Sequence, residues 1–253
     1  MALVLIPLPS RDFDPTEAAL PWAELRRRGH HVRFATPRGQ AAAADPRMVE
    51  GTGLGLWKPL LRANSDGRAA YASMIEDPEF KQPWSYERAV EQPIDGLVLP
   101  GGHAPGMREY LESAAVQSIA AAAFDRQIAV GAICHGVLVA ARSKSRSGKS
   151  VLFGRRTTAL TRSLELMGWA LTVAWLGHYY RTYPMTVQAE VTAALAKPSD
   201  FEAGPAAVLR DDPEHLDRGF TLRDGTYVSA RWPGDAHRFA SEYSSLLEEN
   251  VRG

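Results

Sequence analysis

One stretch predicts the fold of this chain: Ile128-Ala129-Val130-Gly131-Ala132-Ile133-Cys134-His135-Gly136. Its run of apolar and small residues indicates a strand buried on both faces, and residues 137–141, which follow, favour a helix. The only cysteine stands at the junction, in the small-x-nucleophile-x-Gly spacing of a nucleophile elbow. Such a turn projects the nucleophile at the carboxyl end of a sheet, and the helix N-terminus is expected to lower the pKa of the thiol. Cys134 is therefore predicted to be reactive, with a buried, inert cysteine as the alternative.

Apolar strands alternate with helical patterns on both sides of this stretch. Asp14 and Pro15 are typical of the N-cap and first position of a helix, and Gly29 is typical of its end. Buried strands that alternate with helices indicate an α/β fold, with a mainly parallel sheet and helices on both faces. The predicted strands cover residues 3–8, 31–36, 94–100, 128–133 and 226–230, and the predicted helices cover residues 15–29, 108–124, 137–141 and 234–250.

The composition excludes several classes of protein. The chain has 253 residues, enough to bury a large core, and its single cysteine cannot form a disulfide within the chain. Its 29 basic and 29 acidic residues cancel, so no general field attracts nucleic acid or an anionic membrane. Apolar runs are too short to span a bilayer, and residues 2–8 lack the flanks of a signal peptide. We expect a cytoplasmic protein that binds neither nucleic acid nor membrane.

Two segments interrupt the alternation of strands and helices. Residues 39–90 hold aromatic residues among Asp, Pro and Gly, and a loop this long usually contains helices of its own. We therefore expect one domain spanning residues 1–253, with a helical insertion at about 39–90. Residues 142–156 carry six basic residues and no acid. We interpret them as a solvated loop, with a phosphate-binding patch as the alternative.

A glycine-rich turn is predicted near the cysteine. The segment Leu99-Pro100-Gly101-Gly102-His103 follows a buried strand, so it opens at the same end of the sheet as Cys134. The backbone N–H groups of Gly101 and Gly102, together with that of His135, could bind a developing oxyanion. A simple tight turn is the alternative.

Glu17 is a candidate partner for the thiol. It lies in the first helical turn after the first strand, again at the carboxyl end of the predicted sheet. A carboxyl there could hydrogen-bond the thiol or transfer a proton. The alternative is an acid placed at a helix N-terminus because the dipole favours it.

Three other patterns lack the spacing that their function requires. Residues 51–56 lack the third glycine of a dinucleotide fingerprint and follow no strand. Gly148-Lys149-Ser150 resembles the end of a phosphate-binding loop, but the first glycine of that loop would fall on Ser143. The seven histidines form no His-Glu-x-x-His pattern and have no cysteine partner for a zinc site. We therefore expect no metal and no cofactor.

Together these motifs resemble the ThiJ/PfpI superfamily, which has the class I glutamine amidotransferase-like fold. The resemblance covers nearly the whole chain. The insertion and the Gly-Gly-His turn are most similar to its heat-shock glyoxalase/chaperone branch. The segments that carry the resemblance are Pro15-Thr16-Glu17, Phe34-Ala35-Thr36-Pro37 with Gly39, Leu99-Pro100-Gly101-Gly102-His103 and Ala132-Ile133-Cys134-His135-Gly136.

The resemblance implies a flavodoxin-like three-layer sandwich, usually a homodimer. It also implies Cys134 as the nucleophile and Glu17 as its carboxyl partner. The Gly101-Gly102-His103 turn and His135 would surround an oxyanion and substrate pocket. In that branch a third acid orients the histidine, and Glu165 is the candidate by position, with a helical surface acid as the alternative.

Glutamine amidotransferases place a His-x-Glu near the last strand, and this chain departs from that pattern. It has Arg231-Trp232-Pro233-Gly234-Asp235 there, whereas His215-Leu216-Asp217 precedes the strand and ends in Asp. This departure counts against glutaminase chemistry. The aromatic segment from Tyr179 to Pro184 either lines the pocket or packs at an interface, and packing is favoured.

Three functions are compatible with these residues. The leading hypothesis is a cofactor-independent enzyme that converts small reactive carbonyls, such as methylglyoxal to lactate, through a hemithioacetal on Cys134. The zero net charge is consistent with a small, neutral carbonyl substrate. The alternatives are a cysteine amidase or peptidase, and a stress chaperone or oxidation sensor in which Cys134 is oxidised.

Overall fold

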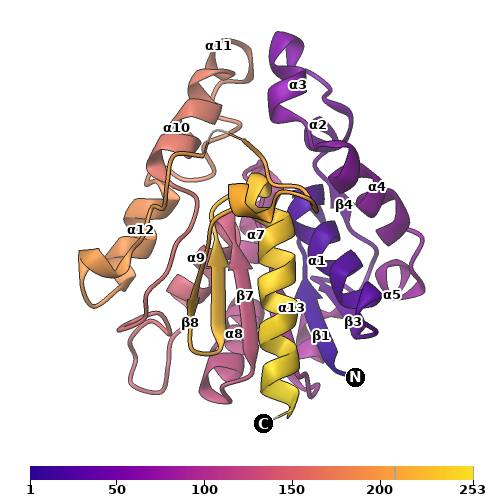
Figure 1. The fold of residues 1–253 in the computed structure, drawn as a ribbon, viewed down its shortest axis with the longest axis vertical. Coiled ribbons are helices and arrows are strands. Elements are labelled where there is room, and N and C mark those ends of the chain that lie inside the picture. The colour runs from indigo at the N-terminus through magenta and orange to yellow at the C-terminus, as the bar shows by residue number, and fades with distance from the viewer. Residues whose placement is uncertain (208, 253) are drawn as a thin grey trace.

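A computed structural model describes residues 1–207 and 209–252 of the chain (Figure 1). Its centre is a sheet in the order β5-β3-β1-β6-β7-β9-β8, in which the edge strand β8 runs antiparallel to β9 and the other described strands are parallel. The predicted α/β fold with a mainly parallel sheet is confirmed. The strands are β1 Leu3–Pro7, β3 His31–Thr36, β5 Trp84–Ser85, β6 Gly96–Leu99, β7 Ala129–Ile133, β8 Thr221–Asp224 and β9 Tyr227–Ala230, with β2 Arg11–Phe13 and β4 Ala43–Ala44 paired separately.

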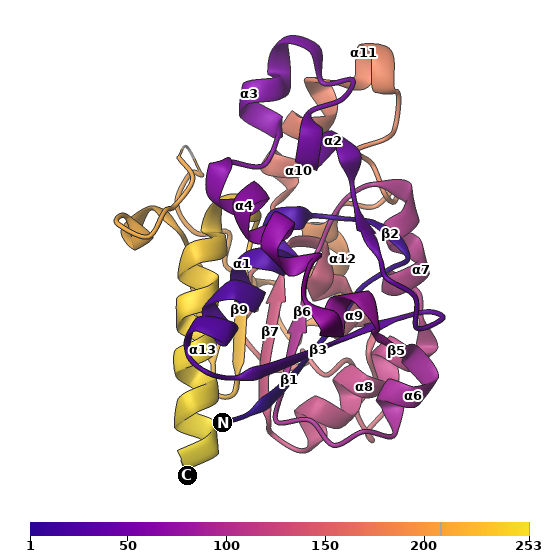
Figure 2. The same cartoon turned by 90° about the vertical axis from the view of Figure 1, so that its right-hand side faces the viewer.

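Helices cover both faces of the sheet and form a three-layer sandwich. The helices α1 and α13 pack on one face, and α6, α8 and α9 lie on the other (Figure 2). Because both faces are covered, the central strands are uniformly apolar, as the sequence predicted. The helices are α1 Pro15–Arg27, α2 Pro46–Glu50, α3 Lys58–Leu61, α4 Ser65–Met74, α5 Pro78–Lys81, α6 Tyr86–Val90, α7 Arg108–Leu111, α8 Ala114–Asp125, α9 Val137–Arg142, α10 Arg162–Ala170, α11 Val173–Leu176, α12 Val187–Ala194 and α13 Ala236–Arg252.

The structure differs from the sequence-based expectation at several elements. The helix predicted over residues 108–124 is two helices, because the Ser113 side chain accepts from the Val116 N–H and starts α8 as a new N-cap. The strands β2, β4 and β5 contain only two or three residues, too few for a pattern. The strand β8 was missed because an edge strand alternates in burial and lacks a continuous apolar run.

The segment between β3 and β6 contains the helices α2 to α6. In Figure 1 the helices α2 and α3 rise above the carboxyl ends of the strands, opposite α10 and α11. These two pairs of helices come from distant parts of the sequence, and they stand on either side of the region where β6 and β7 end.

The basic segment at residues 142–156 contains a short turn closed by the bridge between Lys144 and Ser150. Four of its basic side chains pair with carboxylates from other elements, which supports the structural interpretation of this segment. The pairs are Arg142 with Glu190, Arg146 with Asp125, Arg155 with Asp224 and Arg156 with Glu202.

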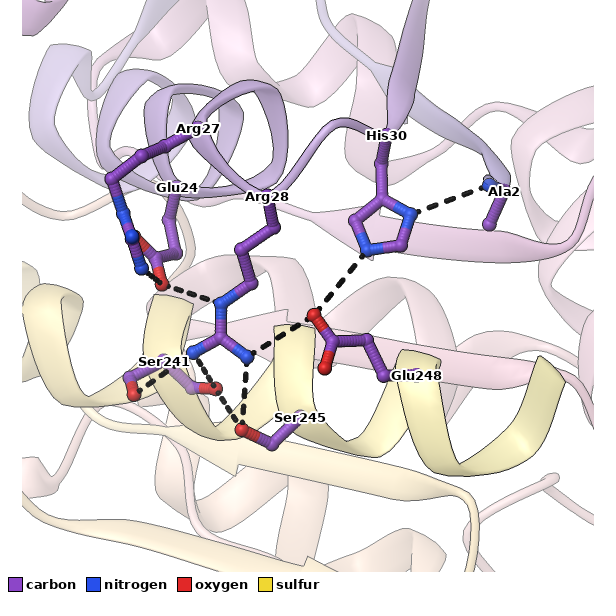
Figure 3. A network of polar contacts seen from close by, with 8 residues as sticks. All are labelled: Ala2, Glu24, Arg27, Arg28, His30, Ser241, Ser245 and Glu248. Atoms are coloured by element: carbon purple, nitrogen blue, oxygen red, sulfur yellow. Dashed lines mark hydrogen bonds and ion pairs between the residues drawn. The ribbon is translucent and has the colours of Figure 1, made fainter. Parts of the chain in front are cut away.

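A polar network fixes α1 against the terminal helix α13 (Figure 3). At the end of α1, Arg28 donates through Nε to Glu24 at 2.7 Å and through Nη1 to Ser245 at 3.2 Å. Glu248 of α13 lies 3.4 Å from Arg28 Nη1 and 3.7 Å from His30 Nε2. The helix that carries Glu17 is thereby held in a defined place.

A buried ion pair closes the loop after β9, and its removal should strongly destabilise the protein. Arg231 Nε and Nη2 donate to the two carboxylate oxygens of Asp235 at 2.8 and 2.9 Å, and both side chains are only 1% exposed. We expect Asp235→Asn to lower the free energy of unfolding by about 3–5 kcal/mol, because it leaves a buried guanidinium without its counter-charge. Urea unfolding measures this loss, and Glu249→Gln at the exposed pair with Arg223 should leave the midpoint nearly unchanged. Equal midpoints for the two variants would contradict the prediction.

Candidate active site

Cys134 directly follows β7 and begins the short, sharp turn Cys134–Gly136, which leads into α9. Its φ of +57° lies in the left-handed region, which residues other than glycine rarely adopt. Gly136 permits the turn, because a Cβ there would lie 2.0 Å from the carbonyl oxygen of Leu99. The elbow geometry that the sequence predicts is therefore present.

Glu17 enters the site from the first turn of α1. Asp14 caps this helix as predicted, and its Oδ1 accepts from the N–H groups of Thr16 at 2.8 Å and Glu17 at 3.1 Å. Glu17 Oε2 accepts from the Gly101 N–H at 2.8 Å, and the Cys134 thiol lies near enough to the carboxyl to change its pKa. A Cβ at Gly101 would lie 2.6 Å from Glu17 Oε2 and 2.9 Å from the Cys134 Cβ, so glycine is needed for these residues to meet.

The surroundings of Glu17 favour its neutral form. Burial raises the pKa of the Glu17 carboxyl well above its ordinary value, because no water solvates the charge. The nearby Asp14 carboxylate raises this pKa further, while the Cys134 thiol and the Gly101 N–H lower it. Glu17 can therefore hold a proton near neutral pH and exchange it with a bound molecule.

The pKa of the Cys134 thiol differs from the value that the sequence predicts. Burial raises its pKa well above the ordinary value, and the carboxyls of Glu17 and Asp14 add to this effect. The nearby His135 backbone N–H lowers the pKa, but it does not offset the loss of water around a residue that is 2% exposed. The prediction of a lowered pKa is therefore wrong, and a base must take the proton when the sulfur reacts.

His135 is placed to act as that base. Its Nδ1 lies 3.5 Å from the Cys134 Sγ, and its Nε2 lies 3.2 Å from the Thr182 hydroxyl oxygen. That hydroxyl donates its single proton to the His103 carbonyl at 2.8 Å, so it accepts from His135 Nε2–H. Burial lowers the pKa of His135 well below its ordinary value. The ring is therefore neutral, with its proton on Nε2 and the bare Nδ1 facing the thiol.

Glu165 lines the same pocket but does not orient His135. Its Oε2 accepts from the Val187 N–H at 2.9 Å, and its Oε1 lies 3.5 Å from Arg181 Nε. Thr182 takes the place beside the imidazole that the resemblance gave to an acid. No motif marks Thr182 in the sequence, since it lies in a segment that resembles a packing element.

The Gly101-Gly102-His103 turn lies beside the thiol, and one of its predicted oxyanion donors is used differently from the prediction. The Gly101 N–H is committed to Glu17, so the N–H groups of Gly102 and His135 stay the predicted donors to an oxyanion. Gly102 has a φ of +146°, and a Cβ there would lie 2.9 Å from the Asp14 backbone nitrogen. It therefore lets the turn pack closely against the start of α1.

His103 is a wall of the pocket. Its ring lies 4.1 Å, centroid to centroid, from Tyr180, and burial lowers its pKa to about 3, so it is neutral. Tyr180 lines the pocket too. The aromatic segment at residues 179–184 therefore contributes to the site, whereas the sequence favoured a packing role.

A pocket of about 410 Å³ opens over Cys134. Asp14, His103 and Cys134 line it, together with residues from α2, α3 and α10, from the loop before β8 and from the loop after β9. Most wall residues are apolar, among them Leu60, Leu160, Leu164, Met167, Leu171 and Trp232. A bound molecule is therefore largely shielded from water at the reacting sulfur.

Within the described residues, no group of three or more His, Cys, Asp or Glu side chains could hold a metal ion. No helix in the same part of the chain is long and apolar enough to cross a membrane.

We expect Glu17→Gln to change the pH dependence of Cys134 alkylation by iodoacetamide. Below the raised pKa of Glu17 the carboxyl is neutral like the amide, so both proteins should react at similar rates. Above that pKa the carboxylate repels the thiolate, and the variant should react faster, by about tenfold for each unit by which the repulsion raises the thiol pKa. Mass spectrometry reports the modification, because Cys134 is the only cysteine. A wild-type rate that overtakes the variant as pH rises would contradict the expectation.

Solved structures of other proteins share the fold. The Rapid Encystment Protein from Francisella tularensis has a TM-score of 0.70 at 16% identity, covering 98% of this chain and 99% of that one. Glyoxalase III from Candida albicans has a TM-score of 0.67 at 18% identity, covering 97% of each chain. Drosophila melanogaster DJ-1beta has a TM-score of 0.57 at 16% identity, covering 100% of this chain and 96% of that one. At these identities the likeness shows the fold alone.

A curated relative and a family model add sequence similarity. An uncharacterized protein of Schizosaccharomyces pombe is 30% identical over 118 residues, which are 46% of this chain and 43% of that protein, so the chain matches less than half of that relative's length. A family model described as ThiJ/PfpI family-like matches residues 8–205. This range includes Glu17, Gly101 and Cys134, which meet at one site. The chain therefore belongs to the ThiJ/PfpI family.

Proposed function

We propose that this chain is a cysteine-dependent enzyme that converts 2-oxoaldehydes, such as methylglyoxal, into 2-hydroxy acids without glutathione or another cofactor. One observation carries the proposal: the Cys134 thiol contacts both a carboxyl that holds a proton, Glu17, and a neutral imidazole, His135. This reaction needs a sulfur nucleophile and two groups that move protons between adjacent carbons. The similar fold of a protein named glyoxalase III supports this chemistry.

The first step is addition of sulfur to the aldehyde carbon. His135 Nδ1 takes the thiol proton as the new C–S bond forms, and it then passes the proton to the former aldehyde oxygen. The product is a neutral hemithioacetal. The His135 backbone N–H, which lowers the pKa of the thiol from close by, can stabilise the oxyanion that precedes this proton transfer.

The second step is an internal oxidation and reduction that needs no outside electron carrier. His135 removes the proton from the carbon bound to sulfur, while Glu17 gives its proton to the neighbouring carbonyl oxygen, which yields an enediol. Glu17 then takes back a proton from the first hydroxyl, and His135 returns its proton to the second carbon. The first carbon is now oxidised to a thioester and the second is reduced to an alcohol. Water hydrolyses the thioester, which releases the hydroxy acid and the thiol.

Amide or peptide hydrolysis is the second candidate function, because a Cys–His contact of 3.5 Å also suits acyl transfer. The histidine and acid of amidotransferases have no equivalent after β9, where Arg231 and Asp235 form the buried ion pair. His215 pairs with Asp212 and does not line the pocket. An oxidation sensor is disfavoured, because a buried thiol with a raised pKa holds little thiolate.

The test is hydroxy acid formation by the purified chain from methylglyoxal in buffer that contains no glutathione. Lactate should accumulate in proportion to enzyme, and intact mass should show a transient adduct of one methylglyoxal on Cys134. An amidase would instead release amines from amide substrates and leave methylglyoxal untouched. That second result would overturn the proposal.

A further inference from the structure

The pocket over Cys134 is larger than methylglyoxal requires. Its volume of about 410 Å³ lies in the range of about 300–1,000 Å³ that holds drug-sized ligands. Methylglyoxal is little larger than a few water molecules and would leave most of this space unfilled. The walls contain Leu60, Leu164, Met167 and Trp232, so a ligand that fills the pocket carries an apolar chain beyond its reacting carbons.

One cation faces this apolar space. Among the described residues that line the pocket, Arg210 is the single Lys or Arg. Its Nη2 donates to the carbonyl oxygens of Leu60 at 3.3 Å and Arg62 at 3.4 Å, and its guanidinium lies 5.4 Å from the centre of the Trp232 ring. Its Nη1 is buried and has no hydrogen-bond partner among the described residues. A buried charged donor left without a partner is unfavourable, so this atom indicates a missing acceptor.

The position of Arg210 is fixed by its neighbour. The Asp211 N–H donates to the Gly234 carbonyl at 2.8 Å, and its carboxylate accepts from the backbone N–H groups of His237 and Arg238 at the start of α13. This anchoring holds the guanidinium at the pocket, although it lies in a loop. An arginine fixed in advance loses little freedom when it binds a ligand.

The acidic side chains near Arg210 leave its Nη1 without a hydrogen bond. Asp14, Glu17 and Asp211 act on the guanidinium through charge, but no hydrogen bond between it and any of them occurs in the described residues. Asp14 Oδ1 already accepts from two backbone N–H groups, and burial raises the pKa of all three acids. A ligand carboxylate could therefore approach Nη1 without displacing an existing bond.

We propose that the substrate is a 2-oxoaldehyde whose apolar chain ends in a carboxylate, with the oxoaldehyde at Cys134 and the carboxylate bound by Arg210 Nη1. This assignment rests on the proposed function and narrows it. The zero net charge of the chain was consistent with a neutral substrate. The proposed substrate is instead an anion, because Arg210 places a positive charge at the pocket.

The experiment compares an ω-carboxy-2-oxoaldehyde with its own methyl ester, which has the same chain and no charge. Wild-type enzyme should prefer the acid in kcat/KM, and Arg210→Gln should lower the acid-to-ester ratio by about ten- to hundredfold. Glutamine is chosen because its amide can still donate to the carbonyl of Leu60 or Arg62. Arg47→Gln is the matched control, because Arg47 lies on nearby α2, packs on Tyr179 and does not line the pocket. An acid-to-ester ratio that is the same in wild type and Arg210→Gln would overturn the proposal.

A second measurement does not depend on turnover. Cys134 is alkylated with a maleimide that carries a carboxylate at the end of an alkyl chain, and in parallel with the methyl ester of the same reagent. The ratio of the two rates should fall in Arg210→Gln and stay unchanged in Arg47→Gln. If no 2-oxoaldehyde is turned over but this ratio falls, the proposed reaction is wrong and the carboxylate site stands. If turnover occurs and neither ratio changes, the reaction stands and the carboxylate site is wrong.

Discussion

Cys134→Ala should lower kcat/KM for 2-oxoaldehydes at least about a thousandfold, because the sulfur forms the bond through which every later step runs. Alanine leaves Glu17 and His135 in place but gives them no hemithioacetal to act upon. The measurement is lactate formation from methylglyoxal without glutathione, with the covalent adduct followed by intact mass. The adduct should disappear together with the activity.

The control for this variant is its stability. Removing a buried sulfur should lower the free energy of unfolding by only about 1 kcal/mol, far less than would unfold the protein. A folded Cys134→Ala protein that still forms lactate at the wild-type rate would show that another group performs the chemistry. Cys134→Ser, which keeps the shape of the side chain but is a much weaker nucleophile, should behave like the alanine variant.

Gly136→Ala should lower the free energy of unfolding by about 3 kcal/mol or more, and activity should be lost with it. The new Cβ would lie 2.0 Å from the Leu99 carbonyl oxygen and 2.7 Å from that of Pro100. Both obstacles are backbone atoms just before the Gly101 turn, so relief requires the elbow and that turn to move apart. Such a movement would separate Cys134 from Glu17. Urea unfolding gives the stability change, and iodoacetamide reactivity reports on the thiol.

The matched control is Gly168→Ala in α10. A Cβ at Gly168 would meet no described atom within 4 Å outside the backbone of its own helix, so alanine should stabilise the protein by about 0.5–1 kcal/mol. The two variants make the same chemical change in opposite surroundings. If both shift the unfolding midpoint by the same amount and in the same direction, close packing at the elbow is not what requires Gly136.

The sequence predicted the central strands and the elbow because these features depend on local pattern. Strands such as β6 and β7 are continuous apolar runs, since helices cover both faces of the sheet. The predicted N-cap at Asp14 was confirmed because a cap depends on hydrogen bonds to residues two and three positions away. The strand β8 and the break between α7 and α8 escaped prediction, because each depends on weak local signals in a few residues.

The sequence alone determined the fold class and the residues Cys134, Glu17 and Gly101 that meet at the site, because parallel strands bring their carboxyl ends to one edge. The tertiary structure decided the protonation states and the partners. Burial by distant segments raised the pKa of the thiol that a helix N-terminus was expected to lower. Thr182, and not Glu165, hydrogen-bonds His135. Arg210 lines the pocket from a loop that is distant from Cys134 in the sequence. Desolvation and long-range contacts depend on which segments meet in space, and no spacing along the chain records that.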